Sequence, residues 1–299
     1  MDRIDSAGNG RYKAWKKLKT VHGRKKQDAF LVESHKLVVE ALLSGMDMEA
    51  LVIDREKMDR ILPLFIANLK ERHREKTEFE EDISLKVENE LKAILDSGGG
   101  DYISQEIAGW VKDRAVLLPH ALFEDLSSME NSDGLLAVIR EPGSDGRLVG
   151  FRQPGLYLVL DGIQDPGNLG TLLRTGEALG FHRVLLLDSC DPSNEKVLRA
   201  SMGASFRLEI CRSSEKDALV WKEESDIPWL GADMEGEDYR LFPKKDPPLA
   251  LVIGSEGQGI RPGFMAVLDG KVSIPMAPQV ESLNAAVSGA ILMAYFSTI

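Results

Sequence analysis

Six short apolar runs recur across the second half of the chain and constrain its fold more than any other feature. They are LYLVL, RVLLLD, RLEICR, PWLGAD, LALVIG and KVSIP, all between residues 156 and 275. Segments with helical periodicity separate them. Near-continuous apolar strands that alternate with helices are typical of a parallel sheet covered on both faces. The sequence therefore predicts an α/β domain over residues 156–299.

A smaller α/β unit is predicted for residues 1–140. Residues 29–34 and 49–56 have the composition of strands, and a helix is expected between them, ending at Gly45. A highly charged stretch at about 68–100 contains an amphipathic helical pattern and ends in SGGGD. Residues 141–155 are rich in glycine, proline and charge, which favours a linker. Two domains also suit a chain of 299 residues.

The stretch DPGNLGTLLRTGEALGF, residues 165–181, predicts a helix with one buried face. That face is formed by Leu169, Leu172, Leu173, Gly176, Leu179 and Gly180. Asn168 is expected to cap the helix, and Gly170 to leave room above the backbone beside Arg174. Arg174 falls on the side opposite the buried face. It is either an ordinary solvated arginine or a side chain held there for a function.

Two further loops follow predicted strands and carry unusual polar residues. GSEGQG places Glu256 after LALVIG, and Ser282 and Asn284 come shortly after KVSIP. Ligands of parallel sheets gather at the carboxyl ends of strands. GSEGQG lacks the lysine of a phosphate-binding loop and the spacing of a dinucleotide fingerprint. Taken singly, each loop is an ordinary turn or cap, and only the set of three predicts a site.

Charge is unevenly distributed along the chain. The net charge is −11, yet residues 1–26 hold nine Lys and Arg against two Asp, so this segment carries +7 and the remainder −18. Tyr12, Trp15, Leu18 and Val21 recur at helical spacing, which favours an ordered basic helix over a tail without a partner. Such a helix is suited to nucleic-acid phosphates. The candidate RNA-binding residues are Arg11, Lys13, Lys16, Lys17, Arg24, Lys25 and Lys26.

Composition excludes several other classes. The N-terminus has no apolar run of a signal peptide, and residues 285–296 are too short to span a bilayer. Two cysteines without CxxC spacing and five scattered histidines predict neither a disulfide framework nor a metal site. A soluble cytoplasmic protein without membrane association is expected.

The three loops resemble a known family. NLGTLLRTGEALGF, LVIGSEGQGI and IPMAPQVESLNAAVSGAI are similar to the three motifs of the SpoU (TrmH-type) RNA ribose 2′-O-methyltransferases of the SPOUT superfamily. NEKVLRASMGASF, between the first two, also matches. The resemblance covers about residues 156–299. Residues 9–55 more loosely resemble the family's substrate-binding domain, a ribosomal-protein-like α/β fold, with Ser34 where glycine is usual.

The resemblance implies a fold and a chemistry. The parallel sheet would carry a trefoil knot that forms an S-adenosylmethionine pocket, and the protein would be a homodimer through its catalytic domain. Small residues of the last helix would permit close packing there. The implied cofactor-binding residues are Ile253, Gly254, Ile274, Met276 and Leu283. The implied catalytic residues are Arg174, Asn168, Glu256, Ser282 and Asn284.

The implied reaction is methyl transfer from S-adenosylmethionine to a ribose 2′-hydroxyl, with large-subunit ribosomal RNA as the expected substrate. Arg174 would act as base or as orienting clamp. Alternatives are a transfer-RNA ribose 2′-O-methyltransferase and a non-catalytic RNA-binding or ribosome-assembly protein on the same scaffold. A base methyltransferase of the same superfamily and a nucleotide-binding enzyme that uses GSEGQG are further alternatives.

Overall fold

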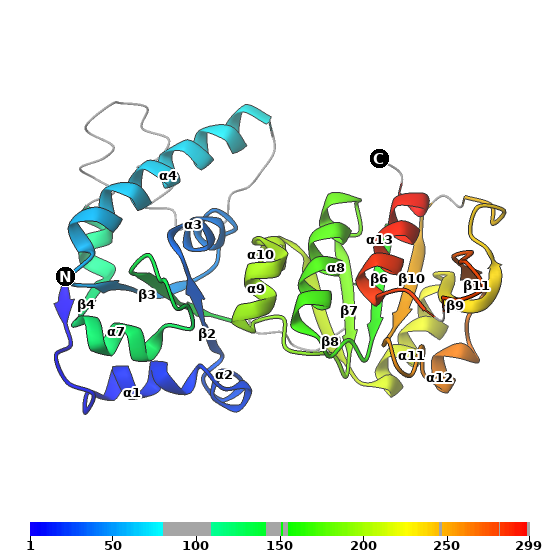
Figure 1. Ribbon diagram of the computed structural model, residues 1–299, viewed down its shortest axis with the longest axis horizontal. Helices are drawn as coiled ribbons and strands as arrows, with labels where there is room; N and C mark the ends of the chain where they lie inside the picture. Colours follow the sequence, from blue (N-terminus) through cyan, green and yellow to red (C-terminus); the bar gives the residue numbers. More distant parts are fainter. Residues whose placement is uncertain (80–108, 142–150, 152–154, 245–246, 281, 298–299) are drawn as a thin grey trace. The chain divides into compact units, whose positions relative to one another are not determined.

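The chain forms two compact units in a computed structural model, Met1–Gly143 and Ser144–Ile299 (Figure 1). The structure describes the chain except residues 80–108, 142–150, 152–154, 245–246, 281 and 298–299. Part of the charged stretch expected at 68–100 therefore lies outside the described residues. Each unit has its own sheet and its own hydrophobic core.

The first unit is built on a five-stranded mixed sheet. Its order is β1 (Asp2–Arg3), β4 (Ala115–Leu118), β3 (Met48–Asp54), β5 (Leu135–Arg140) and β2 (Ala29–Glu33). β5 runs antiparallel to both of its neighbours, whereas the other pairs are parallel. The strands predicted at 29–34 and 49–56 are thus confirmed. The expected helix between them is α3 (His35–Leu43), and Gly45 follows it with φ of 75°.

The helices α1 (Gly10–Lys17) and α7 (His120–Leu126) pack on one face of this sheet. Trp15 and Phe123 belong to the same core cluster as Val52 and Val138 of the strands. The helix α4 (Met58–Phe79) packs against α3 and contains the first residues of the charged stretch. The arrangement leaves the polar sides of α1 and α2 (Val21–Gln27) exposed.

The single basic helix predicted near the N-terminus is instead two helices. α1 ends at Lys17, and Thr20 caps α2 by accepting a hydrogen bond from the amide of Gly23 at 3.1 Å. The chain turns so sharply that a Cβ on Gly23 would lie 1.8 Å from the Lys17 carbonyl oxygen. Val21 therefore leaves the buried stripe and is 46% exposed, whereas Trp15 and Leu18 are buried as expected.

The second unit is built on a six-stranded sheet in which every pair is parallel. Its order is β11 (Gly270–Ser273), β9 (Trp229–Asp238), β10 (Leu249–Gly254), β6 (Leu156–Asp161), β7 (Arg183–Leu187) and β8 (Glu209–Ser213). All six predicted strands are therefore confirmed. β7 and β8 are added on one side of β6. The later strands β9, β10 and β11 lie on its other side.

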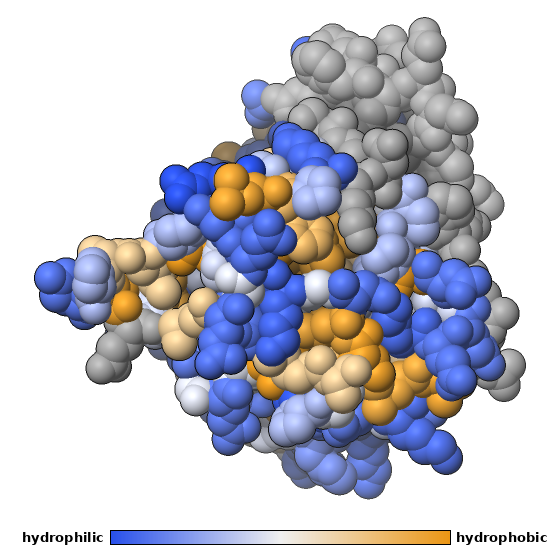
Figure 2. Space-filling model, turned by 90° about the vertical axis from the view of Figure 1, so that its right-hand side faces the viewer, coloured by the Kyte–Doolittle hydropathy of each residue, from blue (hydrophilic) through white to orange (hydrophobic). Residues whose placement is uncertain are grey.

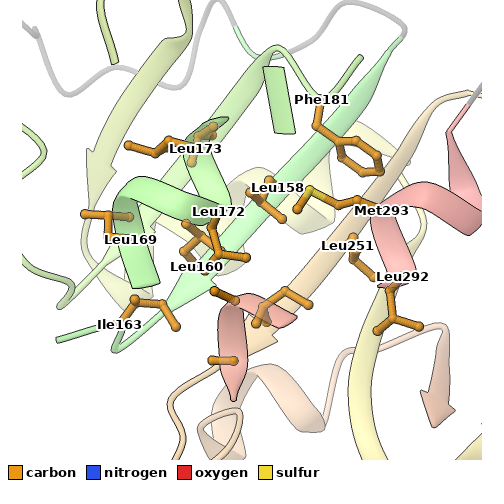
Figure 3. Packing of buried hydrophobic residues seen from close by; sticks show 14 of the residues in the cluster. Leu158, Leu160, Ile163, Leu169, Leu172, Leu173, Phe181, Leu251, Leu292 and Met293 are labelled. Carbon is orange, nitrogen blue, oxygen red and sulfur yellow. The ribbon is translucent and has the colours of Figure 1, made fainter. Parts of the chain in front are cut away.

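Helices cover both faces of this sheet, because alternate strand residues point to opposite sides. Leu158 and Leu160 join one core with α8 (Pro166–Ala178), α9 (Glu195–Ser201), α10 (Ala204–Arg207) and α13 (Ala285–Phe296). Figure 3 shows Leu172 of α8 and Met293 of α13 among the side chains of Leu158 and Leu160. Tyr157 and Val159 join a second core with α11 (Glu215–Ser225) and α12 (Pro262–Met265). The covered parallel sheet is as predicted, and the knot stays a prediction from the resemblance.

One residue of the predicted linker belongs to the second core. Phe151 is 3% exposed and packs edge-on against Trp221, with ring centroids 6.2 Å apart. The indole Nε1 of Trp221 donates to the Phe151 carbonyl at 2.8 Å. The core of the second unit therefore begins before residue 156, where the sequence placed its start.

Candidate active site

The three loops singled out from the sequence meet at one edge of the six-stranded sheet. Two of them follow β6 and β10, which are neighbours in the sheet and lie on either side of the point where its strand order reverses (Figure 1). The third follows β11 and leads into α13. Crevices at such switch points are the usual ligand sites of parallel sheets. Topology thus brings residues more than 100 positions apart to one place.

Asp165, rather than Asn168, caps the helix α8. Its carboxylate accepts a hydrogen bond from the Asn168 amide at 2.8 Å, and Pro166 occupies the first turn. Proline is favoured there because its missing N–H would be unpaired in any case. The predicted capping role of Asn168 is therefore wrong. The side chain of Asn168 is left for contacts outside its helix.

Asn168, Glu256 and Asn284 form a hydrogen-bonded polar cluster. Oε1 of Glu256 accepts from Asn168 Nδ2 and from Asn284 Nδ2, each at 2.7 Å. Asn284 Nδ2 also approaches Asn168 Oδ1 at 2.9 Å. Asn284 Oδ1 caps α13 through the amides of Ala286 and Val287, which fixes the amide group of Asn284. Three of the five predicted catalytic side chains are thus in direct contact.

The two oxygens of Glu256 have different surroundings. Oε1 accepts every hydrogen bond that the carboxylate makes within the described residues, including one from the Ala285 amide at 3.3 Å. Oε2 has no donor in the described part of the chain. The N-terminal end of α13 favours a negative charge here. The arrangement holds a carboxylate with one oxygen fixed and the other available.

A tight turn carries Glu256 into the site. Ser255 and Gly259 exchange backbone hydrogen bonds at 2.9 and 3.2 Å, and Gly259 has φ of 65°. A Cβ on Gly254 would lie 2.1 Å from the Gly259 carbonyl carbon. The family resemblance implies that a cofactor lies against Gly254. The close approach of the Gly259 backbone, however, already requires a glycine at position 254.

Arg261 anchors the end of this turn and is absent from the residues predicted from the sequence. Its guanidinium contacts Asp161 at 2.5 Å, Asp188 at 3.0 Å and Glu215 at 3.2 Å. Hydrogen bonding to Asp161 is the largest cause that raises the pKa of Arg261. Asp161 is the sequence feature that could have indicated this arginine. An acidic residue that ends a buried strand requires a cationic partner.

A cavity of about 440 Å³ lies beside the polar cluster. All five predicted cofactor-binding residues line it: Ile253, Gly254, Ile274, Met276 and Leu283. Glu256 and Ser282 line it as well. Apolar side chains with a few polar groups are the usual lining of a small-molecule site. The lining also includes polar residues such as Asp233, Glu235 and Ser288, so it fits a ligand that combines a flat heterocyclic ring with polar and charged groups, such as S-adenosylmethionine.

A second cavity of about 790 Å³ is lined by the same turn. Residues 255–259 and Ala285 line both cavities. The remaining lining of the second cavity comes from the ends of β6 and β7, from the start of α8 and from the start of α12, and includes Gln164, Asp165, Asn168, Asp188 and Arg261. The polar cluster therefore stands at the junction of the two cavities.

Arg174 lies apart from the polar cluster. It is exposed on α8, lines neither cavity, and makes no hydrogen bond or ion pair with the described residues. Gly170 does not leave the room beside it that the sequence suggested. A Cβ on Gly170 would lie 2.4 Å from Ala200 Cβ, so this glycine allows α8 to pack on α9.

The cysteines offer no nucleophile near this site. Cys190 follows β7 and donates its backbone amide to the Ile163 carbonyl at 2.8 Å. Burial raises the pKa values of Cys190 and of Cys211 to about 11. Both thiols are therefore protonated at neutral pH. Among the described residues, no group of His, Cys, Asp and Glu has the arrangement of a metal site.

The predicted RNA-binding cations of the first unit fall into two groups. Lys16 pairs with Asp125 at 2.7 Å, and Arg11 pairs with Asp2 at 2.9 Å. Arg24 is only 3% exposed and donates to the Leu18 carbonyl, which does not fit the exposed phosphate contact that the sequence suggested. The remaining four are exposed and have no partner within the described residues: Lys13, Lys17, Lys25 and Lys26. We call these four the unpaired lysines.

Comparison with protein families identifies the class to which this fold and site belong. The SpoU rRNA Methylase family matches residues 155–294, and the MRM3-like substrate binding domain matches residues 9–137. Together the two matches cover both units. The chain therefore belongs to the SpoU (TrmH-type) methylase family. Among the described residues, no helix is long and apolar enough to cross a membrane.

Individual relatives match over the whole chain. The 23S rRNA (guanosine(2553)-2′-O)-methyltransferase RlmP of Bacillus subtilis is 29% identical, over 98% of each chain. A Porphyromonas gingivalis structure described as a candidate RNA methyltransferase of the TrmH family is 28% identical, with a TM-score of 0.70 over 97% of this chain and 98% of that one. An AdoMet-bound rRNA methyltransferase from Sinorhizobium meliloti shares the fold, with a TM-score of 0.74 at 22% identity over 99% and 97% of the chains.

Proposed function

We propose that this protein is an S-adenosylmethionine-dependent methyltransferase that acts on a ribose 2′-hydroxyl of large-subunit ribosomal RNA in the cytoplasm. The observation that carries the proposal is the polar cluster at the junction of two cavities. Such a junction allows a methyl donor on one side to meet an acceptor hydroxyl on the other. Membership of the family and the full-length likeness to a 23S rRNA 2′-O-methyltransferase support the same reaction.

The cofactor-binding role is assigned to the five residues that line the smaller cavity. Ile253 and Gly254 end β10, whereas Ile274, Met276 and Leu283 belong to the segment after β11. S-adenosylmethionine would supply an electrophilic methyl group there. The protein's remaining tasks are to orient the ribose hydroxyl and to accept its proton.

Glu256 is assigned the contact to the ribose. Its Oε2 is the free acceptor at the junction, and Asn168 and Asn284 fix the carboxylate through Oε1. Ser282 is exposed at the rim of the cofactor cavity, where its hydroxyl is available to the same substrate. A positioned acceptor for a substrate hydroxyl needs this combination of one fixed and one available oxygen.

Arg174 is assigned a role in the active site of a partner subunit. It has no polar partner among the described residues of its own chain and lines neither cavity, which favours a function in the active site of a neighbouring subunit. A guanidinium is protonated at neutral pH and binds phosphate in a bidentate manner, which favours clamping of RNA over proton removal.

The last helix supports the homodimer. α13 is apolar on every side, and such helices are normally buried all round. Ala285, Ala286 and Gly289, which were expected at a dimer contact, instead pack within the protomer. Val287 is 48% exposed and begins an outer apolar stripe that continues through Ala290, Ile291 and Ala294. Figure 2 shows that exposed apolar residues of this unit lie in small groups bordered by hydrophilic ones.

The first unit is assigned the binding of RNA through the unpaired lysines. Their charges are available, whereas those of Lys16 and Arg11 are balanced within the unit. The contrast between this basic surface and the acidic remainder would direct RNA toward these helices.

Two measurements test the proposed function. Calorimetry should detect binding of S-adenosylmethionine or of its demethylated product to the purified protein. Mapping of 2′-O-methyl groups in total RNA after deletion of the gene should show the loss of one group in large-subunit ribosomal RNA. Binding of neither compound would contradict a methyltransferase. Loss of a transfer-RNA methyl group would show that the substrate is transfer RNA instead of ribosomal RNA. Unchanged methylation would favour a non-catalytic RNA-binding protein.

A further inference from the structure

The smaller cavity, to which the cofactor is assigned, has a third wall that lies outside the three sequence motifs. This wall is formed by Ala232, Asp233, Met234 and Glu235 of β9. Residues 232–236 form a bulge that stands outside the ladder between β9 and β11, since Gly231 and Glu237 pair with consecutive residues of β11. The bulge therefore borders the cavity beside the loops that follow β10 and β11.

Hydrogen bonds and a close approach fix the backbone of the bulge. The side chain of Asp233 accepts a hydrogen bond from the Glu235 amide at 2.8 Å, and the Gly236 carbonyl accepts one from Ser273 Oγ at 2.8 Å. A Cβ on Gly236 would lie 2.6 Å from the Val272 amide nitrogen, so glycine is required there. The backbone that carries Asp233 and Glu235 along the cavity wall thus has a defined course.

The charged side chains that line this cavity all have the same sign. They are Asp233, Glu235 and Glu256, and the described lining contains no lysine, arginine or histidine. Asp233 and Glu235 form no ion pair with any residue that the structure describes. Three carboxylates without a cationic neighbour in the lining create a negative potential that favours a positively charged ligand.

The methyl donor and the product derived from it differ by one charge. S-adenosylmethionine has a carboxylate, an ammonium group and a sulfonium, which leaves one net positive charge. Methyl transfer breaks the bond between the methyl carbon and sulfur, and the electron pair of that bond stays on sulfur. S-adenosylhomocysteine therefore has a neutral thioether and no net charge. A negative potential in the cavity stabilises the bound donor more than the bound product.

The size of the cavity brings these charges within range of the ligand. A sphere of about 440 Å³ would be about 9 Å across, which is similar to the Debye length of about 8 Å at physiological ionic strength. Salt screens the interaction only in part over such distances. The sulfonium charge therefore interacts with the carboxylates wherever the sulfur lies within the cavity.

We propose that the carboxylates of Asp233 and Glu235 bias the cofactor cavity toward the charged donor and against its uncharged product. This inference rests on the proposed placement of S-adenosylmethionine in that cavity and adds two residues that discriminate between the forms of the cofactor. Glu256 contributes charge as well, but it belongs to the polar cluster and is left unchanged in the test. The consequence for turnover is weaker inhibition by the product than an uncharged wall would allow.

Calorimetry measures this bias as the Kd of S-adenosylhomocysteine divided by the Kd of S-adenosylmethionine. The double variant Asp233→Asn, Glu235→Gln should lower this ratio by about 3- to 10-fold, since one exposed charge interaction typically changes an equilibrium constant by roughly 1.5- to 5-fold. Both replacements keep the shape of the side chain, and asparagine can still accept the hydrogen bond from the amide of residue 235. An increase in salt from about 50 to about 500 mM should lower the ratio more in the unchanged protein than in the double variant.

Two controls separate this charge effect from other causes. Glu237→Gln is the matched variant, because Glu237 lies in the same strand, is exposed and lines neither cavity. Its ratio should equal that of the unchanged protein. Sinefungin is the matched ligand, because it carries a positively charged amino group on carbon in place of the methyl group on sulfur. Its affinity relative to S-adenosylhomocysteine should fall in the double variant as that of S-adenosylmethionine does.

The outcomes distinguish this inference from the proposed function. An unchanged ratio in the double variant, or an equal change in Glu237→Gln, would refute the role of the two carboxylates and leave the methyltransferase function standing. A loss of affinity for S-adenosylmethionine but not for sinefungin would assign the preference to contacts of the methyl group and refute the charge effect. Glu235→Gln alone is decisive if the double variant fails to fold, since it leaves the hydrogen bond accepted by Asp233 intact. Failure of the unchanged protein to bind any of the three compounds would contradict the proposed function itself.

Discussion

The polar cluster of the second unit and the basic helices of the first place their functional groups in opposite ways. Asn168, Glu256 and Asn284 contact one another and can adopt few other geometries. The unpaired lysines have no hydrogen-bond or ion-pair partner within the described residues and are interchangeable as point charges. A site of the first kind fails when a single group is removed. A surface of the second kind loses affinity in small, salt-dependent steps.

The largest effect is expected from Arg261→Met. Asp161 is buried, with a side chain only 4% exposed, and would lose the guanidinium that balances its charge. Removal of one partner of a buried ion pair costs about 3–5 kcal/mol of the free energy of unfolding. Urea unfolding monitored by tryptophan fluorescence measures this loss. Arg261→Lys should recover part of it, because lysine retains the charge but not the planar fork. A loss under about 0.5 kcal/mol, typical of an ordinary surface substitution, would contradict the role of Arg261 as an anchor.

Arg174→Ala should lower the rate of methyl transfer by roughly 100-fold or more while the fold and donor binding are retained. Single-turnover methylation of saturating RNA measures the rate. Lys216→Ala is the matched control, since Lys216 is an exposed cation on α11, on the opposite face of the sheet. Wild-type rates in Arg174→Ala would show that Arg174 is an ordinary solvated surface residue with no role in methyl transfer.

Arg174→Lys separates the two roles of the arginine. If bidentate clamping dominates, lysine should be nearly as poor as alanine at every pH. If proton removal dominates, activity should recover and rise between pH 6 and 10. The same single-turnover assay across this range distinguishes the two patterns.

Neutralising the unpaired lysines with glutamine should weaken RNA binding by at least about tenfold. The slope of log affinity against log salt should fall by about one for each phosphate that is no longer neutralised. Donor affinity should not change, because the cofactor cavity is formed by the second unit. The double variant Lys16→Gln, Lys19→Gln is the control, since both side chains already contact Asp125. Equal slopes for the two variants would break the distinction between paired and unpaired cations.

The smallest effect concerns pH and the first unit alone. Hydrogen bonding to Asp54, which is fully buried, raises the pKa of His120 above its ordinary value. The resulting stabilisation is complete below the ordinary pKa of histidine and is lost as the pH rises through the raised value. Thermal unfolding from pH 5.5 to 8.5 should therefore show a decline that His120→Gln reduces. An identical pH dependence in the variant would exclude this pair as the cause.

The sequence predicted the strands of both units where hydrophobic burial decides them. The runs around Leu158, Leu185 and Leu251 are long and apolar enough to specify covered strands in any arrangement. The order of those strands depends on contacts between distant segments, which periodicity does not contain. The break between α1 and α2 escaped prediction because it depends on the close approach of Gly23 to Lys17.

The candidate site was predicted as a set of residues but not as a geometry. Asn168 and Asp165 are both good helix caps three positions apart, and only Pro166 at the start of α8 favours Asp165. The hydrogen bond between Asn168 and Glu256 joins residues 88 positions apart and required the folded sheet. Arg261 was missed because an arginine after a glycine-rich loop looks exposed until its three carboxylate partners are located.

The turn formed by residues 255–259 belongs to the walls of two cavities at once. A ligand that shifts this turn from one side changes the free energy of binding on the other side. Thermodynamic linkage then requires the reverse effect to be of the same size. If the methyl donor and the RNA occupy these two cavities and either one shifts the turn, each would be an effector of the other, and the affinity for one would depend on the occupancy of the other.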